Sequence, residues 1–166
     1  DGRWVQHQKL TAMNARPGEE FGFSLAMNGN QLAVGAPQAV RENALGNGTA
    51  YAFVRSGRFW FEQYELRPTP QQWSSYLGAL GHSVAILDNA IIVAAPFAVG
   101  RFTGAPLFFF ERGAPMPNLK AQAQGTLHMG EDLAAERTTL FAGVPQATSG
   151  RVLRYEIQNL PLYTGW

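Results

Sequence analysis

One segment of this sequence occurs three times, and this repetition limits the folds open to the chain. The copies span residues 21–37, 80–96 and 129–145, and they align without a gap. Each copy begins with an apolar residue followed by glycine and ends in proline, with an aliphatic-alanine pair in between. Self-similarity in a fixed order predicts a repeat architecture whose units bury their faces against one another. The positions to which we assign a structural role in the repeat are Phe21, Gly22, Ser24, Gly35, Ala36, Pro37, Gly81, Ser83, Pro96, Gly130, Gly143 and Pro145.

The residues in and after the first copy predict a unit of four antiparallel strands. Residues 22–27 and 31–36 flank Asn28-Gly29-Asn30, a sequence typical of a hairpin turn. Residues 48–55 and 58–66 are expected to form the third and fourth strands, because a short Ser-Gly turn joins them. The second and third copies repeat this order, with a weaker outer strand in the second and no evident one in the third. No helical period of useful length is present.

Two alignments of side chains follow from this arrangement. In the fourth strand, Trp60 and Leu66 are an even number of residues apart and should share one face. Residues 1–10 have the same Trp-to-Leu spacing and predict another outer strand. In the third strands, the residues that we place at the positions of Tyr51 and Phe53 are Leu107 and Phe109 in the second unit and Leu153 and Tyr155 in the third.

Four-stranded antiparallel units with periodic glycine and aromatic residues are typical of β-propeller blades. The sequence therefore predicts an all-β fold of three blades, at about residues 21–66, 80–124 and 129–166. Residues 1–10 would form an outer strand without a partner in its own chain.

The clusters Phe21-Gly22-x-Ser24-x-Ala26 and Gly35-Ala36-Pro37 resemble the FG-GAP repeat, which is named for them. That repeat is found in the propellers of integrin alpha subunits and in many exported bacterial proteins. The resemblance covers nearly the whole chain and is most specific in the first copy. It implies a ring of six or seven blades and an exported protein located outside the cell or on its surface. The later copies depart from the pattern at Leu80, Ala94, Met129, Asp132 and Val144.

The number of strands points to an assembly. Because an outer strand precedes the first unit and none follows the third, we expect Trp4, Leu10 and Tyr155 to take part in strand exchange. Residues 1–10 would complete the third blade of a neighbouring copy, or of a preceding segment of a longer protein. Such a head-to-tail contact closes a ring if the rotation fits and otherwise grows a filament. The equal alternative is that the chain, which starts at Asp1 rather than Met, is a fragment of a longer propeller.

Composition argues against several classes of protein. A net charge of +1 without a basic cluster argues against nucleic-acid binding. The absence of cysteine excludes disulfides and thiolate metal sites. No apolar run reaches the roughly 18 residues that span a bilayer. The resemblance brings calcium into question, but the predicted loops between second and third strands hold a single acid, Glu42, so we expect neither calcium nor another cofactor.

No catalytic arrangement is evident either, and we expect the protein not to be an enzyme. His7, His82 and His128 are isolated, and we expect them at the surface and at blade edges. The two serines of the repeat occur without the Gly-x-Ser-x-Gly pattern and are expected to be structural. The acid pairs Glu19-Glu20 and Glu131-Asp132 are expected to be solvated.

Aromatic residues in the predicted loops are the remaining candidates for binding, although packing between blades would equally explain them. They could contact a protein or a glycan. We therefore predict a non-enzymatic recognition or structural module that binds a protein partner or copies of itself. A carbohydrate-binding lectin on the same scaffold is the alternative. The candidate residues are Trp73, Tyr76, Phe97 and Phe102.

Overall fold

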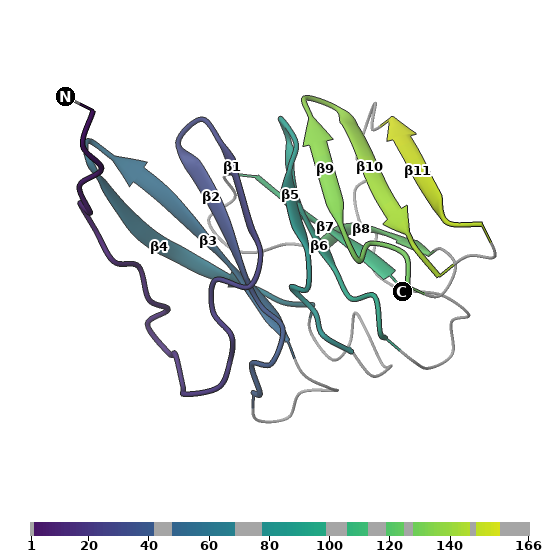
Figure 1. The fold of residues 1–166 in the computed structure, drawn as a ribbon, viewed down its shortest axis with the longest axis horizontal. Coiled ribbons are helices and arrows are strands. Elements are labelled where there is room, and N and C mark those ends of the chain that lie inside the picture. Colours follow the sequence, from purple (N-terminus) through teal and green to yellow (C-terminus); the bar gives the residue numbers. More distant parts are fainter. Residues whose placement is uncertain are drawn as a thin grey trace.

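The computed structural model describes residues 2–41, 48–68, 78–98, 106–112, 119–124, 128–146 and 149–156. Every regular element in these residues is a strand, and the strands form three antiparallel sheets placed side by side (Figure 1). The predicted all-β fold of propeller blades is therefore confirmed. The described part of the chain contains no helix that could cross a membrane.

Each sheet is one blade, and its strands lie in chain order. Blade 1 consists of β1 (Leu25–Asn28), β2 (Gln31–Ala36), β3 (Thr49–Ser56) and β4 (Phe59–Leu66). Blade 2 consists of β5 (Val84–Ile86), β6 (Ala90–Ala94), β7 (Pro106–Glu111) and β8 (Leu119–Gln124). Blade 3 consists of β9 (Leu133–Glu136), β10 (Thr139–Val144) and β11 (Arg151–Glu156).

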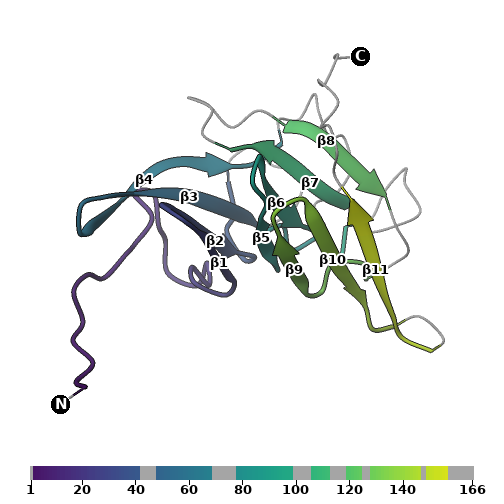
Figure 2. The ribbon, with the colours of Figure 1, turned by 90° about the horizontal axis from the view of Figure 1, so that it is seen from above.

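Blade 2 lies between blades 1 and 3 in both views of the molecule (Figure 1 and Figure 2). The first strands of the three blades are neighbours, since β5 contacts both β1 and β9. Blade 2 consequently buries both of its faces, and every residue of β5 and β6 is buried. This explains why β6 is a continuous apolar run rather than an alternating one.

Two apolar cores fill the spaces between the blades. The core between blades 1 and 2 joins Ala33, Ala52 and Leu66 to Ile91, Val93, Phe108 and Phe110. The core between blades 2 and 3 joins Ile92, Leu107 and Phe109 to Leu140, Ala142, Leu153 and Tyr155. The stability of each blade therefore depends on the neighbour that covers its face.

Among the described residues, each end of the stack has one sheet face that no other blade covers. We call the face of blade 1 that is turned away from blade 2 the leading face. Its strand residues are Leu25, Met27, Leu32, Val34, Tyr51, Phe53, Arg55 and Trp60. We call the face of blade 3 that is turned away from blade 2 the trailing face. Its strand residues are Ala134, Glu136, Thr139, Phe141, Gly143, Val152, Arg154 and Glu156.

The predicted alignment of the third strands is wrong by one residue in blade 2. Val34 pairs with Tyr51 in blade 1, whereas the corresponding Val93 pairs with Phe108. Phe108 and Phe110, not Leu107 and Phe109, thus occupy the positions of Tyr51 and Phe53. A shift of one residue turns each side chain to the other face of the strand. Because blade 2 is apolar on both faces, its strands contain no alternation of apolar and polar residues that would reveal the shift.

The prediction that Trp60 and Leu66 share a face is also wrong. Trp60 packs on the leading face, and Leu66 lies in the core between blades 1 and 2. A β-bulge separates them, because Phe53 pairs with Glu62 whereas Ala52 pairs with Tyr64. The extra residue, Gln63, reverses the alternation of side chains.

The strand predicted at residues 1–10 is not formed, since residues 2–12 contain no strand. A strand requires an edge to pair with, and in its own chain this segment contacts blade 1 mainly through side chains. At the other end of the chain, β11 pairs with β10 alone among the described residues. Residues 157–166, the last part of the predicted third blade, lie outside the described residues.

Candidate interaction surfaces

The joint between blades 1 and 2 is a direct contact between two repeat segments. The Ser24 hydroxyl donates a hydrogen bond of 2.8 Å to the carbonyl oxygen of Gly81. Gly35 lies beneath this contact, and a Cβ atom there would be 2.0 Å from the same carbonyl oxygen. Gly81 has a φ of +87°, and its own Cβ would be 2.1 Å from the Thr49 carbonyl oxygen. These residues therefore define how closely two blades approach.

The joint between blades 2 and 3 repeats the hydrogen bond with different residues. The Ser83 hydroxyl donates to the carbonyl oxygen of Gly130 at 2.5 Å. Gly130 has a φ of +82°. Both serines of the repeat thus donate a hydrogen bond to the blade that follows.

Replacing Ser24 with alanine should lower the free energy of unfolding by about 1–2 kcal/mol, because the Gly81 carbonyl loses its donor. Urea unfolding followed by fluorescence measures this loss. Asp132 occupies the same repeat position in blade 3, after which the described residues contain no further blade, and Asp132→Ala should change the unfolding free energy by less than about 0.5 kcal/mol. Equal losses in the two variants would show that the blade-to-blade hydrogen bond does not stabilise the stack.

An arginine also joins blades 1 and 2, at the end of the sheets away from the Ser24–Gly81 contact. Arg112 follows β7, and its Nε donates to the side-chain oxygen of Gln31 at 2.6 Å. Its Nη2 donates to the carbonyl oxygen of Asn28 at 2.9 Å. Arg112 therefore holds the β1–β2 hairpin of the preceding blade through two acceptors.

On the leading face, the N-terminal segment lies against blade 1. The side-chain amide of Gln8 donates to the carbonyl oxygen of Trp60 at 2.8 Å and accepts from its N–H at 2.9 Å. The Gln8 side chain thus makes the two hydrogen bonds that the backbone of a strand residue paired with Trp60 would make. Leu10 and Ala12 pack against the aromatic cluster of this face, whereas Trp4 is fully exposed. We call residues 2–10 the arm, and its first half has no burial in its own chain.

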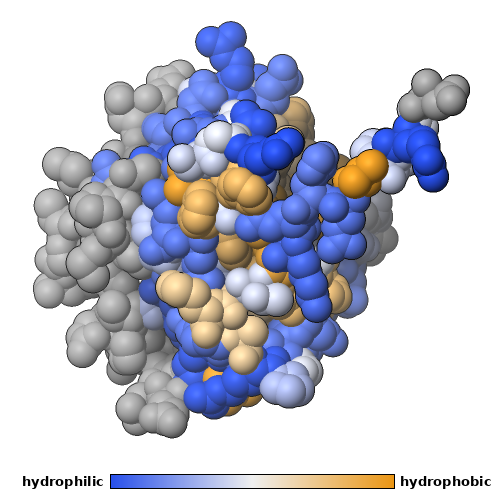
Figure 3. Space-filling model, turned by 90° about the vertical axis from the view of Figure 1, so that its left-hand side faces the viewer, coloured by the Kyte–Doolittle hydropathy of each residue, from blue (hydrophilic) through white to orange (hydrophobic). Residues whose placement is uncertain are grey.

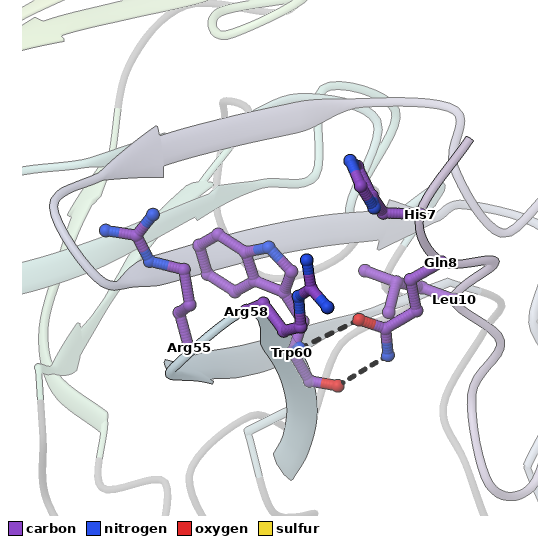
Figure 4. A pocket seen from close by; sticks show the side chains of 6 residues that line it. All are labelled: His7, Gln8, Leu10, Arg55, Arg58 and Trp60. Carbon is purple, nitrogen blue, oxygen red and sulfur yellow. Dashed lines mark hydrogen bonds between the residues drawn. The ribbon is translucent and has the colours of Figure 1, made fainter. Parts of the chain in front are cut away.

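A pocket of about 480 Å³ opens between the arm and β4 (Figure 4). Its lining residues are His7, Gln8, Leu10, Arg55, Arg58 and Trp60. The Arg55 guanidinium lies 5.8 Å from the centre of the Trp60 ring, a cation–π distance. Elsewhere on the leading face, Leu25 and Met27 are exposed, and Figure 3 shows apolar side chains gathered among hydrophilic ones on this side of the molecule.

The segment between the arm and β1 is fixed by a partly buried ion-pair cluster. Arg41 forms ion pairs with Glu19 and, at 3.1 Å, with Glu65, and it donates a hydrogen bond to the Tyr51 hydroxyl. Asn14 accepts hydrogen bonds from Arg41 and from Tyr51. The expectation that Glu19 is solvated is therefore wrong, because its side chain is buried against the arginine.

The electrostatics of this cluster follow from burial and from the arginine charge. Burial opposes ionisation of Glu19, but the Arg41 hydrogen bond and charge outweigh it, so the pKa of this carboxyl is lowered from its usual value. Burial, together with the charge of Glu65, raises the pKa of the Tyr51 hydroxyl to about 12. At physiological pH the Glu19 carboxyl is therefore ionised and the Tyr51 hydroxyl is neutral. This arrangement suits a structural ion pair rather than an acid–base pair.

The trailing face is open and partly apolar. Phe141 is 39% exposed and Val152 is 70% exposed. A pocket of about 450 Å³ is lined by His82, Glu131, Asp132, Gly143, Val144, Pro145, Arg151 and Val152. Asp132 occupies the repeat position of Ser24 and Ser83, and its Oδ1 accepts from the Leu133 N–H at 2.9 Å. Tyr155 points the other way, into the core, where its hydroxyl lies 3.2 Å from the Met129 sulfur.

Aromatic and histidine rings run across all three blades. Successive ring centres are 5.0–5.3 Å apart, in the order Phe23, His82, Phe97, His128. The His82 Nδ1 lies 3.2 Å from the Glu131 carbonyl oxygen, and the His128 Nδ1 lies 2.8 Å from the Glu131 carboxylate. Phe97 thus contacts histidine rings of blades 2 and 3 and is 41% exposed, so packing and a ligand contact both stay predictions for it.

The other predicted candidates divide into two groups. Trp73, Tyr76 and Phe102 lie outside the described residues, as do most of the predicted loops considered for calcium. Phe21 packs edge-on against the rings of Tyr51 and Phe53. In the described ranges, no group of three or more His, Cys, Asp or Glu side chains could hold a metal ion.

Sequence reasoning missed the arginines. Arg55 and Arg112 both stand two residues after the second aromatic of their third strand, once Phe110 rather than Phe109 is matched to Phe53. Their backbone N–H groups also make corresponding hydrogen bonds, to the carbonyl oxygens of Asn30 (2.8 Å) and Asn89 (3.0 Å). The one-residue error in blade 2 hid this correspondence.

Comparison with known proteins agrees with this geometry. Residues 4–53 match the family model described as the FG-GAP repeat. A search of curated protein sequences gave no significant match. Among solved structures, the crystal structure of Saccharomyces cerevisiae Sqt1 is similar, with a TM-score of 0.55 and 16% sequence identity over 87% of this chain. The match spans 34% of the Sqt1 chain, about a third of its length. Residues 4–53 are thus similar to an FG-GAP repeat, and the three blades have the propeller type of fold.

Proposed function

We propose that the chain is a non-enzymatic protein-interaction module in which the arm of one copy completes blade 3 of the next. The proposal rests mainly on two features of this chain that complement each other, an unpaired strand edge and a strand-like segment. The outer edge of β11 has no strand on it among the described residues, and the arm has strand-like sequence without an edge. Unpaired edges of this kind are templates for another strand.

Two further observations support the arm as the missing strand. The match to the FG-GAP repeat begins at residue 4, so the family's unit includes the arm. Trp4 and Val5 are apolar and exposed, and they would gain burial if the arm paired with a blade. FG-GAP repeats are typical of extracellular and surface proteins, which supports an exported location for such an assembly.

The pairing of β3 with β4 supplies an expected register. Tyr51 pairs with Glu65, and Ala50 pairs with Leu66. The corresponding residues of β11 are Leu153 and Val152, because they pair with Ala142 and Gly143. With Trp4 at the position of Trp60, Lys9 is expected opposite Leu153.

This register can be tested by cross-linking, because the chain contains no cysteine. The variant Lys9→Cys, Leu153→Cys should form disulfide-linked oligomers under oxidation, since directly opposed residues have a Cα separation of about 4.5–5.5 Å. Non-reducing gel electrophoresis shows whether the products are dimers of a closed ring or a series of longer chains. A ring of two copies would contain six blades.

The control variant Lys9→Cys, Glu156→Cys displaces the second cysteine by three residues, about 10 Å along the strand. It should cross-link far less. Equal cross-linking in the two variants, or none in the first at concentrations where the wild type associates, would contradict strand donation by the arm. A wild type that remains monomeric at all concentrations, with its fold intact, would contradict self-association as a whole.

A further inference from the structure

Arg55 repeats the position of Arg112, but among the described residues no preceding blade lies against it. Arg112 holds Gln31 and the Asn28 carbonyl, which face each other across the β1–β2 hairpin of the preceding blade. Arg55 has the same place in blade 1 and points onto the leading face, where it lies exposed over Trp60. A matching hairpin would have to come from another blade stacked on the leading face.

Blade 3 offers that hairpin, with a charge that complements Arg55. Glu136 and Thr139 occupy the repeat positions of Asn28 and Gln31, and they too are paired across a hairpin. Both lie on the trailing face, and Glu136 is exposed. In the joint between blades 1 and 2, Arg112 binds two neutral acceptors. The trailing face instead offers Arg55 the carboxylate of Glu136.

The glycines of the two end faces fit the same joint. Gly22 and Gly143 occupy the repeat positions of Gly81 and Gly35, whose close approach shapes the first joint. A Cβ at Gly22 would have nothing within 4 Å, and one at Gly143 would meet its nearest atom at an ordinary 3.6 Å. Gly143 has no positive φ. Nothing in the described contacts of this chain therefore requires glycine at 143, and its missing side chain leaves room for an incoming Gly22 carbonyl, as Gly35 does for that of Gly81. The joint between blades 2 and 3 has Ala94 at this position.

We infer that the trailing face of one copy receives the leading face of a second copy, with Arg55 clamped onto the Glu136–Thr139 hairpin. The inference rests on the head-to-tail association proposed above, but it concerns the packed faces rather than the arm. The complementary charges and the internal joint as a template select a second copy as the occupant. Asp132 weakens this joint, because its carboxylate replaces the serine that would donate to the Gly22 carbonyl.

Charge reversal tests the clamp. Arg55→Glu and Glu136→Arg should each weaken self-association about tenfold or more, because each places like charges against one another. The double variant should recover most of the affinity. Sedimentation equilibrium of the full chain measures the dissociation constants. Arg58→Glu is the matched control, since Arg58 lines the same pocket on the leading face but has no counterpart in the Arg112 clamp, and it should leave association nearly unchanged.

A second substitution gives a result of opposite sign. Asp132→Ser restores the donor found in both internal joints and should tighten association about fivefold, the effect of one net hydrogen bond. A double charge reversal as weak as the single ones, or a weaker Asp132→Ser variant, would overturn the clamp. If the Lys9–Leu153 cross-link still forms in that case, strand donation survives without it. A wild type that never associates overturns both.

Discussion

Gly35→Ala is expected to lower the free energy of unfolding by about 3 kcal/mol, a large loss for the addition of one methyl group. The new Cβ would lie 2.0 Å from the Gly81 carbonyl oxygen and 2.2 Å from the Ser24 hydroxyl. Because the nearest atom belongs to the backbone of another blade, relief requires the two blades to separate. Separation would also break the Ser24–Gly81 hydrogen bond. Urea unfolding, with the midpoint and slope fitted together, measures the change.

Gly143→Ala is the matched control for this effect. It adds the same methyl group at the same repeat position in blade 3, where the nearest atom is 3.6 Å away. At concentrations where the chain is monomeric, its unfolding free energy should differ from that of the wild type by less than about 1 kcal/mol. Similar losses in the two variants would mean that the glycine is needed within a blade rather than between blades.

Phe108→Ala is expected to cost about 3–5 kcal/mol, the usual range for a buried phenylalanine. Phe108 is fully buried in the core between blades 1 and 2, and it pairs with Val93 at the centre of the sheet. The truncated side chain would leave a cavity that the two flanking sheets cannot close without moving. Thermal or urea unfolding provides the measurement.

Phe141→Ala provides the comparison, since Phe141 lies on the trailing face and is 39% exposed. Its loss should remain below about 1.5 kcal/mol for a monomer, because exposed aromatic area contributes less on folding. The trailing face would be shown to contribute to the core of a single chain if the two phenylalanine variants were equally unstable.

The fold could be predicted because the residues that characterise a blade occur three times in the sequence. The glycine, the serine or its replacement, and the closing proline recur in order, and each recurrence marks the same place in a blade. The error at Phe108 arose where this information failed. A central blade is apolar on both faces, so a shift of one residue leaves the hydrophobic pattern of β7 unchanged. The bulge at Gln63 could not be predicted for a related reason. An extra residue in an outer strand shifts the alternation of side chains but is not marked by a particular residue type.

The candidate surfaces were less predictable because they depend on contacts between distant segments. Glu19 has no feature of sequence that distinguishes it from a solvated loop acid, and only its approach to Arg41 makes it a buried ion pair. The clamp by Arg112 needed the correct register before Arg55 could be recognised as its equivalent. The arm shows the opposite limit. Its sequence favours a strand, but a strand forms only where an edge is available.

The full burial of β5 and β6 has a consequence for the synthesis of this protein. When the ribosome has completed blade 2, the face that blade 3 will cover is still bare, and it includes Ile92 and Phe109. The segment Ala90–Ala94 is uncharged, apolar and without proline, the composition of a segment prone to aggregate while exposed. The nascent chain is therefore most vulnerable between the emergence of β7 and that of β10. A chaperone that shields this face, or slow translation after β10 rather than before it, would raise the yield of folded protein.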